Sequence, residues 1–572
     1  MSTSQTMPPV SRRTASLRPA TLGIGLLCLI ILIPVISVLV LATGDTQGVW
    51  PHLVRNVMPS SVGQTLGLLA GVGLLSSALG VITAWLVTQY RFFGRSFLQW
   101  ALIMPLAVPT YIAAYCYYEL MDFTGPLQGW IRALGDFERS GDYWFPEIRS
   151  LGGAIFVMSM VLYPYVYLTC RIVFEMQAGS ILEVSRVLGA GPIRLFRRIG
   201  LPMARPAIAA GAALAMMEAF NDIGAVEILG VRTLTFSVFD TWLNRNSLAG
   251  AAQIACLMLI FVAALVYLER SARRARSYSG TNSAAGPTAK TLYGARSAAA
   301  AAACALPVLA GFAAPVGLMV SFVSRRLEDL GDGALLKAMG NSVLVSGIAA
   351  LLTVACALIF VLSSRNGRAL RIRQFLVRIA SLGYAVPGSV LAIGTLYAFS
   401  AFDNSLDAFM REQFGISTGL LLTGSAAIVI YACSVRFLAI AVGAMESGYS
   451  RINPHLVPVA RTLGRSNLQA TLQIELPLLR RAAAAGGLLV FVDTMKELPA
   501  TILLRPFNFP TLATHVYERA SRALFEDAAI AALAIVAIGL LPVLLLGRMQ
   551  GGLVDAAVKV NANKKTSGPG PA

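Results

Sequence analysis

The chain has 572 residues, of which 56% are hydrophobic and 13% are charged, and its mean hydropathy is +0.69. Soluble domains carry about 25% charged residues, so this chain has too few to cover a water-facing surface. Its apolar residues fall in runs of about 20 or more, the length that crosses a hydrocarbon core of roughly 30 Å. These properties exclude a soluble enzyme and indicate a membrane protein.

Lys and Arg outnumber Asp and Glu by 46 to 28, a net charge of +18 that would suggest nucleic-acid binding in a soluble protein. In a membrane protein such an excess belongs in cytoplasmic loops, so we expect a lipid bilayer and no nucleic acid as partner. The seven Cys all lie inside apolar runs, and the three His are scattered. We therefore expect neither disulfides nor a histidine metal site, and assign no metal ligands.

Apolar windows predict an all-α polytopic membrane protein with about twelve transmembrane helices in two halves. The predicted spans are 20–43, 65–89, 98–121, 152–174, 206–228, 248–268, 298–323, 341–364, 379–400, 418–440, 482–505 and 526–548. The first is too long for a plain cleavable signal peptide, so we expect a retained anchor. Most basic residues fall on one side if the N-terminus is cytoplasmic, which predicts that both termini are cytoplasmic.

Two segments on that cytoplasmic side match each other at a fixed offset. Gly189 and Gly464 are 275 positions apart, as are Pro202 and Pro477. Ala-Val-Pro also recurs, ending at 109 and at 387. An ordered series of matches at a nearly constant offset indicates a duplication. We therefore predict a first half over 1–270, a cytoplasmic linker over 271–297, a second half over 298–550 and a cytoplasmic tail over 551–572.

Each repeated segment is predicted to form a cytoplasmic helical hairpin, over 177–205 and over 452–480. Gly189 and Pro192 are placed to end one helix and start the next. Ser466 and Gln469 have the spacing of a capping box. Such a hairpin could lie on the lipid surface, but its recurrence in both halves favours docking into the groove of a partner.

The repeated sequence resembles the cytoplasmic signature of the permease subunits of bacterial ABC importers, Glu-Ala-Ala-x3-Gly-x9-Ile-x-Leu-Pro. The matching positions are Glu183, Gly189, Ile199, Leu201, Pro202, Gly464, Ile474, Leu476 and Pro477. The resemblance implies ATPase coupling through these residues, two copies of a cytoplasmic ATPase subunit, a periplasmic substrate-binding protein and a place in the bacterial inner membrane. Because Pro458 replaces the glutamate of the second motif, we expect the two docking sites to be unequal.

The duplicated single-chain form is similar to the ferric-iron uptake permeases, as are the segments 109–115 and 492–508. This resemblance implies ferric iron as substrate, with thiamine or a phosphonate as alternatives, since those permeases are also built as duplicated chains. The chain has no Gly-x4-Gly-Lys-[Ser/Thr] phosphate loop, so we expect the partner to use ATP and this chain to bind no cofactor and to be no enzyme. A secondary transporter is the second hypothesis, but it has no use for two inward docking elements.

Two pairs of carboxylates predict a polar pathway through the membrane. Glu218 and Asp222 lie four positions apart, on one helical face, and the repeat places Asp493 and Glu497 at the equivalent positions of the second half. A rise of about 1.5 Å per residue places Glu218 and Asp493 about 17 Å in, just past the midplane, and the other two about 23 Å in. A carboxylate facing lipid at such depth costs several kcal/mol. They are therefore expected to line a cation pathway between the halves, or to pair internally with Lys496 and Asn221.

Three tyrosines, Tyr111, Tyr115 and Tyr118, share one face of the predicted helix 98–121. The outermost, Tyr118, fits an aromatic belt at the membrane surface. The deeper Tyr111 and Tyr115 are candidates for the translocation pathway or for helix packing. Gly224 and Pro499 follow the two carboxylate pairs and are expected to break their helices.

Overall fold

The computed structural model describes residues 19–46, 48–139, 142–177, 191–274, 289–363, 370–453 and 455–543. Helices make up nearly all of these residues, and their one sheet consists of two short parallel strands. The predicted all-α fold is therefore confirmed.

The first half alternates long apolar helices with short ones. Its elements are α1 (Pro19–Leu41), α2 (Val49–His52), η1 (Leu53–Val57), α3 (Met58–Gln89), β1 (Tyr90–Arg91), α4 (Arg95–Ala101), η2 (Met104–Ala107), α5 (Thr110–Met121), α6 (Pro126–Gly135), α7 (Leu151–Gln177), α9 (Pro192–Leu195), η3 (Phe196–Gly200), α10 (Leu201–Asn221), α11 (Ile223–Ile228), α12 (Leu234–Leu243) and α13 (Leu248–Arg274).

The second half also alternates long apolar helices with short ones. Its elements are β2 (Lys290–Thr291), α14 (Gly294–Val308), η4 (Leu309–Ala313), α15 (Ala314–Arg325), η5 (Leu327–Gly331), α16 (Gly333–Ser363), α17 (Leu370–Ala380), η6 (Ser381–Tyr384), α18 (Gly388–Phe414), α19 (Ala427–Tyr449), α20 (Leu456–Thr462), α21 (Asn467–Ala470), η7 (Thr471–Glu475), α22 (Leu476–Met495), α23 (Pro499–Leu504) and α24 (Leu512–Ser521), followed by a last helix over Phe525–Val543. The elements α21, η7 and α22 follow α9, η3 and α10 at the same offset that separates the repeated motifs.

Nine helical stretches within the described residues are long and apolar enough to cross a membrane. They are Gly23–Leu41, Val49–Gln89, Leu151–Glu175, Pro192–Asn221, Leu248–Leu268, Gly294–Arg325, Gly333–Ser363, Ala427–Tyr449 and Phe525–Val543. A bent pair, Arg95–Ala107 with Thr110–Gly135, brings the number to ten if it is one span. The structure thus confirms a polytopic protein, whereas the number of twelve transmembrane helices remains a prediction.

Four of the predicted spans are wrong as continuous helices. The span 98–121 bends by 95° around Pro109, and the span 379–400 is interrupted before Pro387. Each proline precedes the first residue of a new helix, since proline has no N–H to continue the earlier one. The spans 206–228 and 482–505 break at 222 and at 496–498, beside the predicted carboxylates. The helix predicted over 418–440 begins only at Ala427.

The two halves are separate in sequence but interlocked in space. The first helix, α1, packs against α17 and α18 of the second half, while α14 packs against α3 and α4 of the first half. Strand β2 pairs with β1, so that Lys290 lies opposite Tyr90. Residues 275–288 of the predicted linker 271–297, and the tail 551–572, lie outside the described residues. The described ends of that linker belong to α13, β2 and α14.

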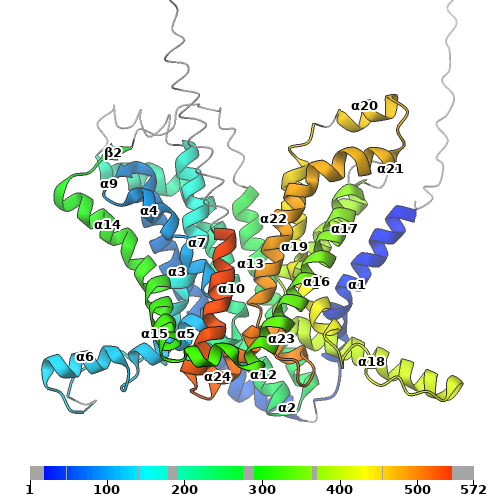
Figure 1. Cartoon of the computed structure of the whole chain (residues 1–572), viewed down its shortest axis with the longest axis horizontal. Helices are drawn as coiled ribbons and strands as arrows, with labels where there is room; N and C mark the ends of the chain where they lie inside the picture. The colour runs from blue at the N-terminus through cyan, green and yellow to red at the C-terminus, as the bar shows by residue number, and fades with distance from the viewer. Residues whose placement is uncertain are drawn as a thin grey trace, which may run out of the picture.

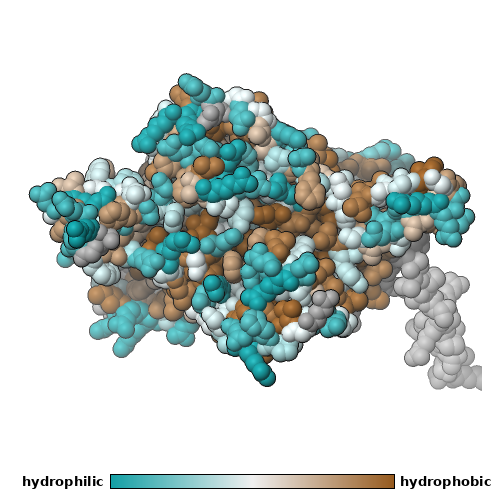
Figure 2. Space-filling model, turned by 90° about the horizontal axis from the view of Figure 1, so that it is seen from below, coloured by the Kyte–Doolittle hydropathy of each residue, from teal (hydrophilic) through white to brown (hydrophobic). Residues whose placement is uncertain are grey.

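The short helices α9, α20 and α21 lie on one side of the molecule, which we call the hairpin side (Figure 1). The opposite side carries α2, α12 and α24, and from it α6 and the end of α18 project in opposite directions (Figure 1). Figure 2 shows this opposite face, where hydrophilic and hydrophobic residues are mixed. Between the two sides, exposed apolar side chains such as Leu74, Ile260 and Leu351 fit contact with lipid.

The crossing of α1 and α18 depends on Gly394. A Cβ atom at this position would overlap the backbone carbonyl of Pro34, which a side-chain movement cannot relieve. We expect Gly394→Leu to lower the free energy of unfolding by about 1–3 kcal/mol or more, through overpacking. The matched control is Gly443→Leu on α19, where a Cβ has nothing within 4 Å. Thermal unfolding in detergent measures both, and equal shifts would contradict the close crossing.

Candidate transport site

The four predicted carboxylates come together in one cavity between the two halves. The cavity has a volume of about 100 Å³ and is lined by Glu218, Asp222, Asp493 and Glu497. This volume holds several water molecules or a partly hydrated ion. Some further lining residues also form pairs that the repeat makes equivalent, such as Leu162 with Phe437, so the cavity lies between equivalent parts of the two halves.

Two of these carboxylates are placed by the helix breaks. Asp222 follows the last residue of α10 and caps α11, because its side chain accepts a hydrogen bond of 2.9 Å from the backbone N–H of Ala225. Glu497 accepts bonds of 2.9 Å from the N–H groups of Ala500 and Thr501 in α23. Free N–H groups at a helix start favour a negative charge. The predicted breaks therefore exist, and in the first half the break lies just before Gly224.

Each carboxylate also has a partner from the protein itself. Arg436 forms an ion pair of 2.9 Å with Glu497, and both side chains are almost completely buried, with 8% and 1% exposed. Lys496 forms an ion pair of 2.8 Å with Asp493. The first-half carboxylates accept hydrogen bonds from hydroxyl groups: Tyr384 donates to Glu218, and Thr110 donates to Asp222.

The sequence predicted internal pairing as the alternative to a cation pathway. Part of this pairing is present, because Lys496 forms an ion pair with Asp493. The predicted pairing of Asn221 is not seen, because no hydrogen bond joins its side-chain NH2 group to a carboxylate among the described residues; its side-chain oxygen has no hydrogen-bond partner there either. Within those residues no group of three or more His, Cys, Asp or Glu is arranged to hold a metal ion. In this conformation the carboxylates are thus engaged by Arg, Lys and hydroxyl groups of the chain.

Arg436 is the main residue of the site that sequence reasoning misplaces. The positive-inside rule assigns it to the basic cytoplasmic segment 436–481, but its side chain lies in the cavity, on the long apolar helix α19. The signal is present, because a charged residue within an apolar span is functional by default. Tyr384 and Thr110 are also missed, since single hydroxyl groups near a predicted span give no comparable signal.

The predicted tyrosines separate into different environments. Tyr111 lines the cavity, and its buried hydroxyl has no hydrogen-bond partner among the described residues. Tyr115 is fully buried but does not line the cavity, and its ring stacks on Phe525 at 5.7 Å between centroids. Tyr118 is half-buried and also contacts Phe525. The structure therefore places Tyr111 beside the carboxylates and Tyr115 in helix packing.

The second hairpin has the local geometry that its sequence predicts. Ser466 and Gln469 form the capping box, with hydrogen bonds of 3.0 and 3.2 Å between each side chain and the other's backbone N–H. Gly464 has a φ of +83°, a left-handed conformation that favours glycine. The hairpin exposes Val459, Leu463 and, beyond the turn, a further leucine at 468, and such apolar surface fits a protein partner.

The other motif positions lie at the bases of the two hairpins. In the first, Ile199 and Pro202 are half-buried and Leu201 is exposed. In the second, Ile474 is half-buried, whereas Leu476 and Pro477 are exposed. Glu183 and Gly189 lie outside the described residues, in 178–190.

The base of the first hairpin is fixed to the long helices by aromatic packing. Trp85 of α3 contacts Phe174 and Phe196 edge-on, with 5.2 Å between centroids in each pair. A Cβ atom at Gly200 would overlap the Trp85 ring, so this glycine permits the close contact. Because Phe196 begins η3 and Phe174 lies near the end of α7, the base of the hairpin packs directly against α3 and α7.

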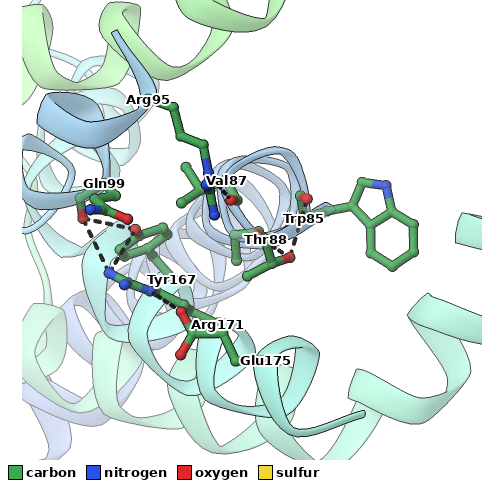
Figure 3. Close-up of polar contacts among 9 residues, drawn as sticks. Trp85, Val87, Thr88, Arg95, Gln99, Tyr167, Arg171 and Glu175 are labelled. Carbon is green, nitrogen blue, oxygen red and sulfur yellow. Dashed lines mark hydrogen bonds and ion pairs between the residues drawn. The ribbon is translucent and has the colours of Figure 1, made fainter. Parts of the chain in front are cut away.

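A polar cluster beside Trp85 connects α4 to the same helices (Figure 3). Arg171 forms an ion pair of 2.7 Å with Glu175, and Tyr167 donates a hydrogen bond of 2.9 Å to the carbonyl of Gln99. Arg95, at the start of α4, donates one of 2.7 Å to the carbonyl of Val87. Hydrogen bonds therefore connect α4 to both α3 and α7 on the hairpin side of the first half.

A bundle of apolar helices around a charged internal cavity, with the short helices α9, α20 and α21 on one side, defines a multi-pass membrane transport protein. Residues 76–276 match the family described as binding-protein-dependent transport system inner membrane component, and the chain belongs to this family. Its members are the permease components of ABC transporters, which work with ATPase and substrate-binding partners. The chain is accordingly an ABC importer permease of the inner membrane.

The chain is similar to several transport permeases. The Fe(3+)-transport system permease protein FbpB 2 of Haemophilus influenzae is 27% identical over 92% of this chain and 97% of its own length. The sulfate transport system permease protein CysT of Salmonella typhimurium is 30% identical over 38% of this chain and 76% of its own length. A probable ABC transporter permease of Sinorhizobium fredii, y4fN, is 25% identical over 82% of this chain and 83% of its own length. These relatives are transport permeases, which fits a non-enzymatic role.

Proposed function

We propose that this permease moves ferric iron from a periplasmic binding protein into the cytoplasm. The observation that carries the proposal is the cavity between the halves, where four carboxylates face two cationic side chains. This charge balance attracts a cation and repels an anion such as sulfate. Ferric iron is a hard cation that prefers oxygen donors, and carboxylates and tyrosine hydroxyls are what the cavity offers. The relative that aligns with nearly the whole chain is named for Fe(3+) transport.

The hairpin side is proposed to face the cytoplasm and to bind two copies of an ATPase subunit. The exposed apolar residues of α20 and α21 support this, as does the repetition of the hairpins. With this orientation both chain termini are cytoplasmic, and the opposite face, with α12 and α24, receives the binding protein. ATP is used by the ATPase subunits, and this chain needs no cofactor of its own.

Uptake measurements test the substrate. Cells that lack the permease gene, with and without the chain restored, are given labelled ferric iron, thiamine, aminoethylphosphonate and sulfate in separate assays. We expect only ferric iron uptake to depend on the chain. Chain-dependent uptake of one of the other three, without iron uptake, would overturn the ferric iron proposal and identify the alternative.

Tyr111 gives a prediction that separates transport from folding. Its hydroxyl has no hydrogen-bond partner among the described residues, so Tyr111→Phe should leave thermal stability unchanged. If the hydroxyl contacts the passing cation, iron uptake should fall about threefold or more. Tyr115→Phe is the matched control, because its buried hydroxyl is likewise unpartnered in the described part of the chain but lies outside the cavity. Equal uptake by both variants and the wild type would assign Tyr111 to packing alone.

A further inference from the structure

The cavity is symmetric in its carboxylates but not in its cations. Each half supplies two carboxylates, whereas both cationic side chains, Arg436 and Lys496, come from the second half. The equivalent positions of the first half hold Val161 and Asn221, which also line the cavity. The packing supports this correspondence. Gly211 of the first half lies close to residues 166 and 169, and its equivalent, Gly486, lies close to residues 441 and 444, which are the same two positions shifted by 275. The two halves therefore differ in the number of cationic side chains that they contribute to the cavity.

This difference leaves the two halves in unlike electrostatic states. In the second half, Glu497 and Asp493 are each held in an ion pair shorter than 3 Å. In the first half, Glu218 and Asp222 have hydroxyl and backbone N–H partners, and neither forms an ion pair among the described residues. Unneutralised carboxylates inside a protein attract a cation more strongly than carboxylates that already have one. The two cavity carboxylates without an ion-pair partner among the described residues therefore both belong to the first half.

Two oxygen atoms from the first half are also available to a ligand. The Tyr111 hydroxyl and the Asn221 side-chain oxygen are buried, line the cavity and have no hydrogen-bond partner among the described residues. Buried polar atoms usually have a partner, so such atoms around a polar cavity mark a place for a further group. Both belong to the first half, as do the two carboxylates without ion pairs.

We infer that Glu218, Asp222, Tyr111 and Asn221 form a cation-receiving site in the first half, while Arg436 and Lys496 act as internal counter-ions that keep the second-half carboxylates occupied. The inference rests on the proposed function in that the cargo is a cation. The fixed cations reduce the charge of the cavity without blocking the first-half oxygens. The cavity thus presents one oxygen-rich site for a hard, highly charged cation, in place of two equal ones.

Neutral, nearly isosteric substitutions test the difference between the halves. Glu218→Gln and Asp222→Asn should each lower the initial rate of iron uptake by at least tenfold. The matched comparison is the double variant Asp493→Asn with Lys496→Gln, which removes one ion pair at no change in net charge and should lower uptake by threefold or less. Rates are divided by the amount of folded permease in the membrane. Equal losses in both halves, or a larger loss in the second, would overturn the inference.

A direct binding measurement tests the first-half cation site separately from the identity of the transported cation. Terbium(III) is a hard trivalent cation whose luminescence is sensitised by a nearby tyrosine, so it can be titrated into the purified permease with and without its ATPase subunits. We expect sensitised binding that is weakened at least tenfold by Asp222→Asn, only slightly by the double variant, and dimmed by Tyr111→Phe.

The outcomes separate the two proposals. Binding that does not depend on Asp222, or no binding at all, overturns the first-half site whatever the cells take up. The expected pattern of terbium binding to the purified permease, together with no chain-dependent iron uptake by the cells, overturns ferric iron as the cargo and supports the first-half cation site.

Discussion

Replacing Gly464 by valine should lower transport by at least tenfold while the permease remains in the membrane. Gly464 ends α20 with a φ of +83°, and Arg465 donates a hydrogen bond of 3.0 Å to the carbonyl of Ala460, a turn of the Schellman type. A β-branched residue in this conformation costs about 1–2 kcal/mol, so the turn between α20 and α21 would change. The apolar side chains at 459, 463 and 468 would then no longer form one docking surface.

Asparagine provides the control for this substitution, because it tolerates the left-handed conformation better than other residues. A Cβ at 464 meets nothing within 4 Å, so side-chain size alone is not the obstacle. Gly464→Asn should therefore retain a large part of uptake and of ATPase co-purification, whereas Gly464→Val loses both. Full retention of both properties by Gly464→Val would contradict the proposed coupling role of this hairpin.

The helices and the carboxylate site are predictable because their signals are local or repeated. Apolar runs locate the spans, and the constant offset of the repeat pairs Glu218 with Asp493 from the order of the residues alone. The bends at Pro109 and Pro387 are missed because a hydropathy average over a window gives one proline little weight. Yet each proline fixes where a helix starts.

Other features depend on contacts that sequence order does not encode. The exchange of α1 and α14 between halves could not be predicted, since a connection's length does not say which neighbour a helix packs against. The predicted position of Arg436 is wrong because the positive-inside rule assigns basic residues to loops. The rule does not consider an arginine that forms an ion pair inside a span. Its partner, Glu497, is found by the repeat, but the repeat offers valine at the position equivalent to Arg436.

The buried ion pair between Arg436 and Glu497 should have the largest effect on folding. Arg436→Ala leaves a carboxylate that is 1% exposed without its charge partner, and such a loss costs about 3–5 kcal/mol. This is a large part of the roughly 5–15 kcal/mol by which proteins are stable, so the variant should accumulate poorly and unfold at a much lower temperature in detergent.

Removing both charges together should restore much of that stability. In the double variant Arg436→Met with Glu497→Gln, no unpaired charge remains, and the single glutamine oxygen can still accept one of the two N–H groups, of Ala500 and Thr501, that the two oxygens of Glu497 accept at the start of α23. Thermal unfolding of Arg436→Met alone, Glu497→Gln alone and the double variant gives the coupling between the residues. If the double variant is no more stable than Arg436→Ala, the arginine stabilises the bundle through packing of its side chain, and the ion pair is not what holds α19 against the start of α23.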